Sequence, residues 1–559
     1  MQQPCTKCAT PFEISQEDLA FYDKVSPVFN NKKYTIPPPS MCPDCRMQRR
    51  LAFRNERTLY HRTCDLTGKP IISIYSTDKP YRVYQQDAWW SDAWDPRDYS
   101  RDYDFNRSFF EQFEQLKKEV PRMTLETSPE AEENNCLYIN FAGHSKNCYM
   151  IFDSDFNEDS YYTKVLKHSK SCMDCSYVHY SELCYECVNC SNCYGLVYSE
   201  NCANCSDSTF LKNCIGCKNC LFSSNLRQKE YYIWNKPYSK DEYQKIKHSL
   251  NLGSFKNLEQ LKKDFSEFTK KFPQKYVHIL KAENATGDYL TNVEDCHVCY
   301  DLGNAQHMRY CDSIYEGRHC MDVSSFGENI ELIYESTSVG INCYNIQFSL
   351  GAVISCSDLL YCDECRMSNH CFGCVGLKRN SYCILNKQYT KEEYGELVPR
   401  IIESMAIFGD FFPTSLSPFG YNETVAPEHF PLAKDEALRQ GWKWKDQSEA
   451  TYKPATLAAE KIPDHIKEIN QTLCKQILAC VNCNKNYKVI QQELKLYHQL
   501  GIPIPRKCPD CRHMERLAQR NPRRLIDRNC QKCNIPVKST FTQDRPEPIY
   551  CEKCYAHSL

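Results

Sequence analysis

The sequence has almost no net charge and no long hydrophobic run. It contains 69 lysines and arginines against 71 aspartates and glutamates, a net charge of −2 over 559 residues. No overall field therefore draws the chain to nucleic acid, and any basic surface must be local. No apolar stretch approaches the roughly 18 residues of a membrane helix, so we expect no membrane partner. The start, MQQPCTKCATPFEIS, lacks a basic segment followed by an apolar one, so we expect no secretory signal and a cytoplasmic protein.

Motifs of common catalysts are also missing. The chain has no Gly-x-Ser-x-Gly, no phosphate-binding loop and no His-Glu-x-x-His, which are the signatures of several large enzyme classes. We therefore expect a protein that is not an enzyme.

What the sequence has in abundance is cysteine, with 38 residues. Without an export signal, so many cysteines indicate reduced thiols and metal ligands and not a disulfide framework.

Many of these cysteines recur at a fixed period in the first half of the chain. The segments YYTKVL, HYSELC, VYSENC and IGCKNC, beginning at 161, 179, 197 and 215, align in steps of 18 residues. This alignment places Cys184, Cys202 and Cys220 in one column. Recurrence at a short fixed period is typical of a solenoid, so we predict stacked coils that repeat with this period.

A larger repeat predicts a second solenoid. Shifting the chain by 151 residues overlays NLRQKEYYIWNKPYSKDEY, beginning at 225, on GLKRNSYCILNKQYTKEEY, beginning at 376. Both copies end in a capping box, Ser239 with Glu242 and Thr390 with Glu393, which predicts that a helix follows each solenoid.

The central cysteines can be interpreted in three ways. Leucine and serine share their columns, so we favour cysteine as a small hydrophobe that lines the wall. A four-thiolate metal site from Cys184, Cys187, Cys202 and Cys205 and disulfides between coils are the alternatives. In the favoured interpretation Cys202→Ser should destabilise the protein, because a buried hydroxyl would lack a partner.

Paired Cys-x-x-Cys motifs at both ends predict three tetrahedral zinc sites. Four thiolates without an open position form the structural type of zinc site, and zinc supplies folding energy to small modules. The predicted ligand sets are Cys5, Cys8, Cys42 and Cys45; Cys480, Cys483, Cys508 and Cys511; and Cys530, Cys533, Cys551 and Cys554.

The terminal segments also resemble a known family. CTKCATPFEISQEDLAFYDKV followed by MCPDCRMQRR, and CVNCNKNYKVIQQELKLYHQL followed by KCPDCRHMER, resemble the zinc-ribbon, treble-clef-like family. The whole layout resembles that of large uncharacterised zinc-ribbon proteins of candidate-phyla bacteria. The resemblance implies structural zinc and no established activity.

One further copy of the ribbon pattern has lost its ligands. The segment TCDLTGKPIISIYSTDKPYRVYQQDA keeps only Cys64. Gly68 falls close to the second ligand position, and Gln85 and Ala88 fall at the third and fourth. One thiolate cannot hold zinc, so we expect a metal-free module held by packing, with the tryptophans at 89, 90 and 94 nearby.

Arginines follow both Cys-Pro-x-Cys motifs at helical spacing. A helix that starts at the metal knuckle would present them as a stripe suited to phosphates, with few acidic residues near them in sequence. A solvated or salt-bridged helix face is the alternative. The predicted nucleic-acid contacts are Arg46, Arg49, Arg50, Arg54, Arg512, Arg516, Arg520 and Arg524.

Together these features predict a multidomain, mainly β protein: two Cys-rich β-solenoids joined by helical segments and flanked by zinc ribbons. The predicted function is a non-enzymatic zinc-binding scaffold that binds RNA or DNA, with RNA preferred. The alternative is a protein-binding or structural scaffold. The predicted order is a zinc ribbon at 1–63, a metal-free ribbon at 64–98, an amphipathic helix within 99–130, solenoids at 131–236 and 284–387 around a helical connector at 237–283, a helical linker at 388–473, and zinc ribbons at 474–528 and 529–559.

Overall fold

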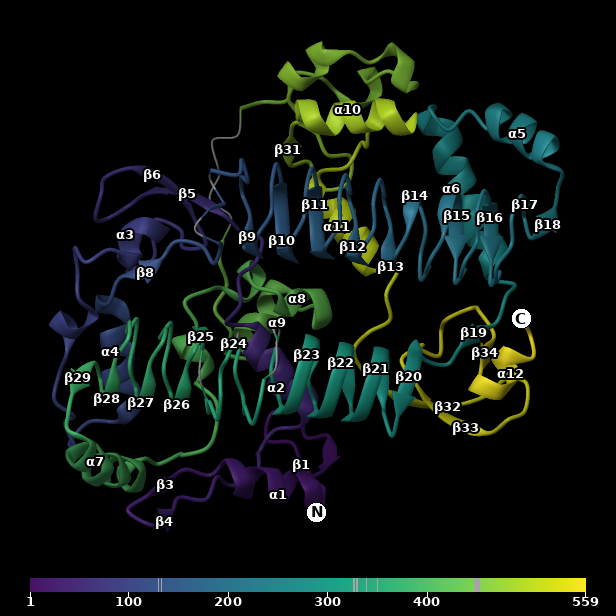
Figure 1. The fold of residues 1–559 in the computed structure, drawn as a ribbon. Coiled ribbons are helices and arrows are strands. Elements are labelled where there is room, and N and C mark those ends of the chain that lie inside the picture. The colour runs from purple at the N-terminus through teal and green to yellow at the C-terminus, as the bar shows by residue number, and fades with distance from the viewer. Residues whose placement is uncertain are drawn as a thin grey trace.

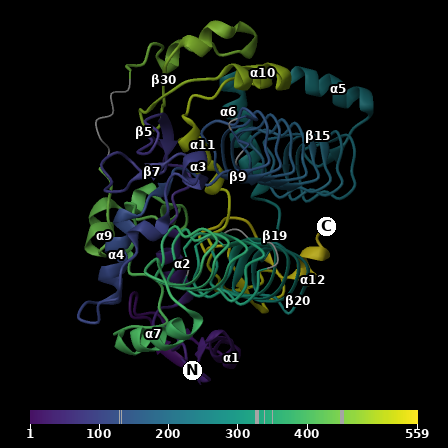
Figure 2. The same cartoon turned by 60° about the vertical axis from the view of Figure 1, so that its left-hand side comes forward.

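Two stacks of short parallel strands form the centre of the molecule in a computed structural model of the chain (Figure 1). The first stack comprises β9–β18 and the second β20–β29. In Figure 1 the first stack runs from left to right and the second from right to left, and Figure 2 shows the two side by side. The structure describes residues 1–128, 130–131, 133–324, 327, 330–337, 339–348, 350–446 and 453–559, so residues 447–452 of the predicted helical linker lie outside it.

The strands of each stack are two to eleven residues long. Those of the first stack are β9 (Asn140–Gly143), β10 (Tyr149–Asp155), β11 (Tyr161–Lys167), β12 (Ser176–His179), β13 (Val188–Ser191), β14 (Tyr194–Val197), β15 (Ser206–Lys212), β16 (Leu221–Ser224), β17 (Tyr232–Ile233) and β18 (Lys236–Pro237). Those of the second are β20 (Ile279–Glu283), β21 (Gly287–His297), β22 (Cys299–Arg309), β23 (Asp312–Met321), β24 (Val339–Ile341), β25 (Ala352–Ile354), β26 (Ser357–Leu360), β27 (Asn369–Phe372), β28 (Ser381–Ile384) and β29 (Lys387–Gln388).

The coils of the first stack are shorter than predicted. Leu166 N donates to Ser154 Oγ of the neighbouring coil, 12 residues earlier. The strands pair in the same step, Tyr149 with Tyr161 and Lys164 with Ser176, so the predicted period of 18 is wrong. The register pairs Met173↔Tyr185 and Ser191↔Ala203 place Cys184 over Cys172 and Cys202 over Cys190. Cys184 and Cys202 therefore belong to different columns.

The shorter coil follows from a left-handed residue at every third position. Tyr177, Tyr180 and Leu183 have φ of 57°, 50° and 56°, and this pattern continues along the stack. Each such residue costs roughly 1–2 kcal/mol for an L-amino acid and turns the chain sharply. Four three-residue sides then close one coil. Because 12 and 18 are both multiples of three, the predicted alignment at 18 matches inward-facing residues with other inward-facing residues. It matches each of them, however, with a residue half a coil away from its true neighbour.

The inward position of the central cysteines is confirmed. Eleven cysteines of the first stack are at most 3 % exposed: Cys172, Cys175, Cys184, Cys187, Cys190, Cys193, Cys202, Cys205, Cys214, Cys217 and Cys220. Their thiols donate to backbone carbonyls, as Cys187 Sγ does to Leu196 O of the next coil at 3.3 Å. None of the 38 cysteines forms a disulfide with a described residue.

Buried serines lie in the same wall and have partners there. Ser199 Oγ donates to Val197 O at 3.0 Å and accepts from Leu211 N at 3.1 Å. The premise that a hydroxyl would lack a partner is therefore wrong. Cys202→Ser should change the free energy of unfolding by less than about 1 kcal/mol, whereas Cys202→Leu should destabilise by about 1–3 kcal/mol through overpacking. Thermal denaturation of the two variants measures this difference, and equal losses would contradict it.

The second stack is built like the first, except that three of its coils are longer. Its early coils advance by the same step: Val298 N donates to Thr286 Oγ1, 12 residues earlier. Three successive steps then advance by 13, from Met321 to Tyr334, Gln347 and Leu360. The separation between equivalent residues of the two stacks therefore grows by three across these steps. The shift of 151 found in the sequence holds only for the coils that come after them.

Helices cap the stacks as the capping boxes predicted. In α5 and α7, Ser239 and Thr390 each accept from the third helical N–H while Glu242 and Glu393 accept from the cap backbone. The helices between the stacks and after the second are α5 (Lys240–Ser249), α6 (Phe255–Thr269), α7 (Lys391–Ser404), α8 (Ala426–His429) and α9 (Lys434–Arg439).

The amphipathic helix predicted within residues 99–130 is present and occupies eleven residues of that range. Because the Ser108 side chain accepts from Glu111 N, α4 (Phe109–Glu119) starts after Phe105, which is exposed. One face of this helix is buried through Phe109, Phe113 and Leu116, with Phe109 against Phe372 and Phe113 against Phe412. In the described part of the chain no helix has the length and apolar character to cross a bilayer.

The terminal modules consist of short hairpins and helices around the stacks. At the N-terminus they are β1 (Gln2–Pro4), β2 (Pro11–Glu13), α1 (Gln16–Val25), β3 (Val28–Phe29), β4 (Lys32–Lys33), α2 (Pro43–Leu51), β5 (Tyr60–Thr63), β6 (Pro70–Ser73), β7 (Val83–Tyr84), α3 (Gln86–Trp90) and β8 (Arg122–Met123). Later in the chain they are β19 (Gln274–Lys275), β30 (Leu478–Ala479), β31 (Asn486–Tyr487), α10 (Gln491–Leu500), α11 (Pro509–Leu517), β32 (Ile526–Asn529), β33 (Pro536–Ser539), β34 (Ile549–Tyr550) and α12 (Glu552–Ala556).

Candidate metal centres

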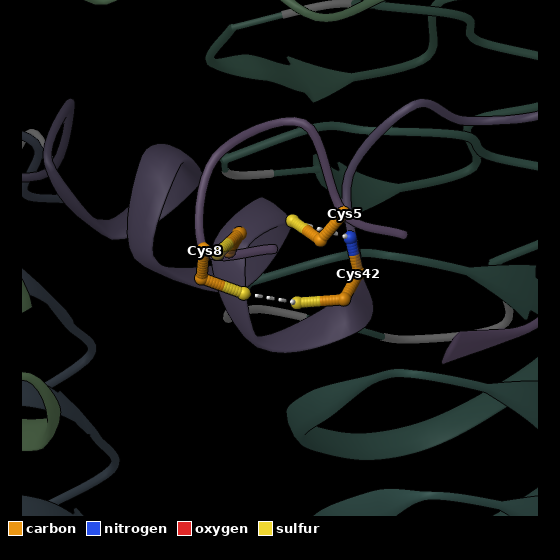
Figure 3. A group of neighbouring side chains, drawn as sticks. Cys5, Cys8 and Cys42 are labelled. Atoms are coloured by element: carbon orange, nitrogen blue, oxygen red, sulfur yellow. Dashed lines mark hydrogen bonds between the residues drawn. The ribbon is translucent and has the colours of Figure 1, made fainter. Parts of the chain in front are cut away.

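The three predicted cysteine sets each converge on one point. In each set the four Sγ atoms lie within 4.8 Å of one another. Across the first, Cys8 Sγ lies 3.7 Å from Cys42 Sγ (Figure 3). The corresponding distances are 3.6 Å for Cys483–Cys508 and 3.7 Å for Cys533–Cys551. Sulfurs about 3.8 Å apart are what a tetrahedral ion with 2.3 Å bonds requires. Each set could therefore hold one metal ion.

The backbone around the thiols favours their ionised form. Cys42 N donates to Cys5 Sγ at 3.3 Å, and Cys551 N donates to Cys530 Sγ at 3.2 Å. Burial raises the pKa of Cys530, but the N–H groups outweigh it and bring this pKa to about 6. Thiolates are the form that binds metal.

The metal-free module around Cys64 keeps the backbone turn of a Cys-x-x-Cys motif but has lost the other ligands. Gln85 N donates to Cys64 Sγ at 3.3 Å, as Cys551 N does to Cys530. Gly68 has φ of 73°, the left-handed position that Asn534 holds at 60°. Gly68 therefore lies one residue after the second ligand position, which Thr67 occupies, and Gly68 supplies the turn. Trp89 and Trp94 are buried beside this module.

Both Cys-Pro-x-Cys motifs start helices, as predicted, but the arginine stripes face inward. Cys42 and Cys508 are the N-cap residues of α2 and α11. Side chains of seven of the eight predicted nucleic-acid contacts are at most 6 % exposed: Arg46, Arg49, Arg50, Arg54, Arg512, Arg516 and Arg520.

We use the name C-terminal ribbon for the module at 474–528, which carries the second cysteine set. Its helix α11 docks on the first stack through one buried carboxylate. Arg512 Nε lies 3.0 Å from Asp174 Oδ2, and Arg516 Nη1 lies 2.9 Å from Asp174 Oδ1. Arg516 Nε also donates to Ser176 Oγ at 3.3 Å. The Arg512 guanidinium lies over the Tyr162 ring, 5.0 Å from its centroid.

In the N-terminal ribbon, α2 makes the same contacts with the second stack. Arg46 Nε lies 2.8 Å from Asp322 Oδ2, and Arg50 Nη1 lies 3.1 Å from Asp322 Oδ1. Arg50 Nε donates to Ser324 Oγ at 3.1 Å, and Arg46 lies over Tyr310 at 5.1 Å. A single shift along the chain carries Asp174 to Asp322, Ser176 to Ser324 and Tyr162 to Tyr310. The two halves of the molecule therefore repeat one interface with the ribbons exchanged.

The segments after both helices reach across to the other stack. Arg54 pairs with Asp153 of the first stack at 3.5 Å, and Arg520 pairs with Asp301 of the second. Burial raises the pKa of Asp301, but Arg520 and Arg523 outweigh it and lower this pKa below its usual value. Asp301 therefore stays ionised at neutral pH and bridges a ribbon to a stack.

These contacts overturn the premise that acidic residues could not neutralise the stripes. The partners Asp174, Asp322 and Glu335 are remote in sequence and come from the strand stacks. Buried and paired arginines leave no surface for phosphate oxygens. Arg524 differs, with 67 % of its side chain exposed and Asp44 3.9 Å away. Of the eight predicted contacts, Arg524 alone presents its guanidinium to solvent.

The acidic partners were missed because carboxylates occur in many of the coils, and the sequence does not distinguish those that face a helix from those that face solvent. What distinguishes Asp174 and Asp322 is burial between a stack and a helix, and that depends on docking of distant segments. The available signal was their equivalence in the internal repeat, since the shift that relates them also relates Ser176 to Ser324.

The interior cysteines do not form a fourth set. Among the described residues, the three terminal clusters are the groups of ligating side chains close enough to share an ion. No protein-family model, curated protein or solved structure matches this chain.

Proposed function

We propose that the protein is a non-enzymatic scaffold in which three structural zinc ions fix ribbon modules onto two β-solenoids. The observation that supports this most is the double use of α2 and α11. The first turn of each of these two helices closes a four-cysteine set, and its arginines dock on a buried aspartate of a strand stack. Four thiolates leave a bound ion no open position for substrate, which is the arrangement of structural zinc.

The two halves of this scaffold hold each other together. The N-terminal ribbon docks on the later stack and the C-terminal ribbon on the earlier one. Neither ribbon can then leave without breaking contacts between segments far apart in the chain. The test is removal of one bridging carboxylate, Asp174→Asn, with docking of the C-terminal ribbon followed by limited proteolysis.

Binding of nucleic acid is a second candidate, favoured by one observation. Residues 227–275 contain eleven lysines and one arginine against six carboxylates. Lys240, Lys245, Lys256 and Lys263 of α5 and α6 are exposed and form no ion pair with a described residue. The end of the first stack is therefore the local basic surface that a chain of net charge −2 would need.

Changing these four lysines to glutamine should weaken binding of single-stranded RNA and flatten its salt dependence. Each phosphate contact that the substitutions remove should reduce the slope of log affinity against log salt by about 0.7. Lys391→Gln on α7, the matching helix of the second stack, serves as the control and should change neither. The measurement is fluorescence anisotropy over a salt series. Failure of the parent protein to bind RNA or DNA at low salt would remove this candidate and leave the scaffold.

A further inference from the structure

A groove of about 280 Å³ lies between the two stacks, and the scaffold function does not account for it. Asp155, Lys167 and His179 line it from β10, β11 and β12 of the first stack, and Tyr315 and Glu316 line it from β23 of the second. Ligand sites are typically concave surfaces of this kind between structural units, with many rings and a few polar groups.

One wall of the groove is a ladder of four parallel rings. His144, Phe156, His168 and Tyr180 come from successive coils at the left-handed position. Their centroids are 4.6, 4.8 and 4.9 Å apart, and their planes differ by 2–8°. Phe156 and Tyr180 are 46 % and 47 % exposed. The coil repeat thus builds an apolar surface that remains open on the groove side.

On the opposite wall, the ring of Tyr315 already interacts with a lysine of the protein itself. The Lys167 ammonium lies over the Tyr315 ring, 5.6 Å from its centroid. His179 stacks on the same ring at 6.0 Å, and burial lowers the pKa of His179 to about 3, so this imidazole is neutral. An ammonium near a ring face is held by the ring's electron-rich face.

The charges along the groove favour a cation over an anion. Four carboxylates and two cationic side chains line it: Glu126, Asp153, Asp155 and Glu316, with Arg54 and Lys167. Internal pairs occupy three of the carboxylates, namely Glu126 with Arg366, Asp153 with Arg54 and Asp155 with His144. Glu316 is exposed and has no ion pair with a described residue.

A second polar space adjoins the groove and shares part of its lining. A cavity of about 60 Å³ shares Arg54, Glu126 and Phe141 with the groove. Glu364 lines this cavity, and its buried Oε2 has no hydrogen-bond partner among the described residues. A buried carboxylate oxygen without a partner is costly and marks a place where a donor can bind.

We propose that this groove binds an organic cation, an amine or quaternary ammonium carried on an apolar or aromatic body. The ring ladder takes the apolar body, and Glu316 and the ring of Tyr315 take the positive charge. Phosphates and carboxylates are disfavoured because Lys167 already lies over the Tyr315 ring and Arg54 is paired with Asp153, whereas Glu316 has no ion pair with a described residue. The site goes beyond the scaffold function and does not depend on it.

The test uses the full-length protein as purified and benzyltrimethylammonium as the probe, with benzyl alcohol and benzoate as neutral and anionic comparators. Ligand-detected NMR should show the cation binding more tightly than either comparator. Tyr315→Leu should weaken its binding about tenfold, because the cation loses its contact with the electron-rich face of the ring. Glu316→Gln should weaken it up to about fivefold, the range of a partly exposed ion pair.

Lys167→Gln gives the sharpest outcome, because it should strengthen binding by removing the competing internal ammonium. Glu182→Gln, an exposed carboxylate outside the groove, is the matched control and should leave binding unchanged. Binding of benzoate with loss on Lys167→Gln would overturn the proposal in favour of an anion site. Failure of the cation to bind at millimolar concentration, or equal binding to the Glu316→Gln variant, would also overturn it. Zinc content of each variant checks that the fold is intact.

Discussion

Replacing Asp174 by asparagine should release the C-terminal ribbon from the first stack. The substitution keeps the shape of the side chain but leaves Arg512 and Arg516 buried without their shared carboxylate. Removing one partner of a buried ion pair typically costs about 3–5 kcal/mol, because the remaining charge is uncompensated. We expect a lower unfolding temperature and rapid proteolysis in the segment before α11.

The internal repeat supplies a matched variant for this experiment. Asp322→Asn removes the equivalent carboxylate from the second stack and should release the N-terminal ribbon instead. Arg524→Gln, on an exposed side chain, should change neither the unfolding temperature nor the cleavage pattern. If both aspartate variants melted and were cleaved like the parent, the arginines would not be what holds the ribbons.

Removing one cysteine ligand should remove one zinc ion from a total of three per chain. Cys483→Ser should leave two, because three thiolates bind zinc much less tightly than four. Zinc binding in comparable small modules is worth about 10–16 kcal/mol, which is also their folding energy. Loss of this ion should therefore loosen α11, whose first turn carries Cys508 and Cys511.

Cys474→Ser provides the control for the metal experiment. Cys474 is partly exposed and belongs to none of the three sets, so this variant should keep all three ions. Native mass spectrometry of protein prepared without chelator counts them. One zinc or none in the parent protein would reject the structural-zinc proposal.

The cysteine sets were predictable because their ligands lie in short, fixed-spacing motifs. A Cys-x-x-Cys turn is a local structure, and duplication at both chain ends strengthened the pattern. The capping boxes of α5 and α7 were predictable for the same reason. The inward direction of the central cysteines also followed from the sequence, because every third residue there is small or apolar.

Coil length and arginine partners were not predictable, and the reasons differ. A spacing of three residues repeats equally well at 12 and at 18, and only backbone conformation at residues such as Tyr177 and Leu183 closes the coil at 12. Whether Arg46 and Arg512 are buried or exposed depends on carboxylates that are 276 and 338 residues away in sequence. Local composition made both stripes look exposed, whereas docking over long distances buries them.

The exchange of ribbons between the stacks also sets the order in which the chain can assemble during translation. Arg46 leaves the ribosome 276 residues before its partner Asp322. At about 5–20 residues per second, that separation corresponds to roughly 14–55 s. The C-terminal ribbon has no such delay, because the first stack, on which it docks, has already been synthesised when this ribbon emerges. For about half of synthesis, 276 of 559 residues, the nascent protein therefore carries one uncompensated cationic helix, which is buried in the finished protein.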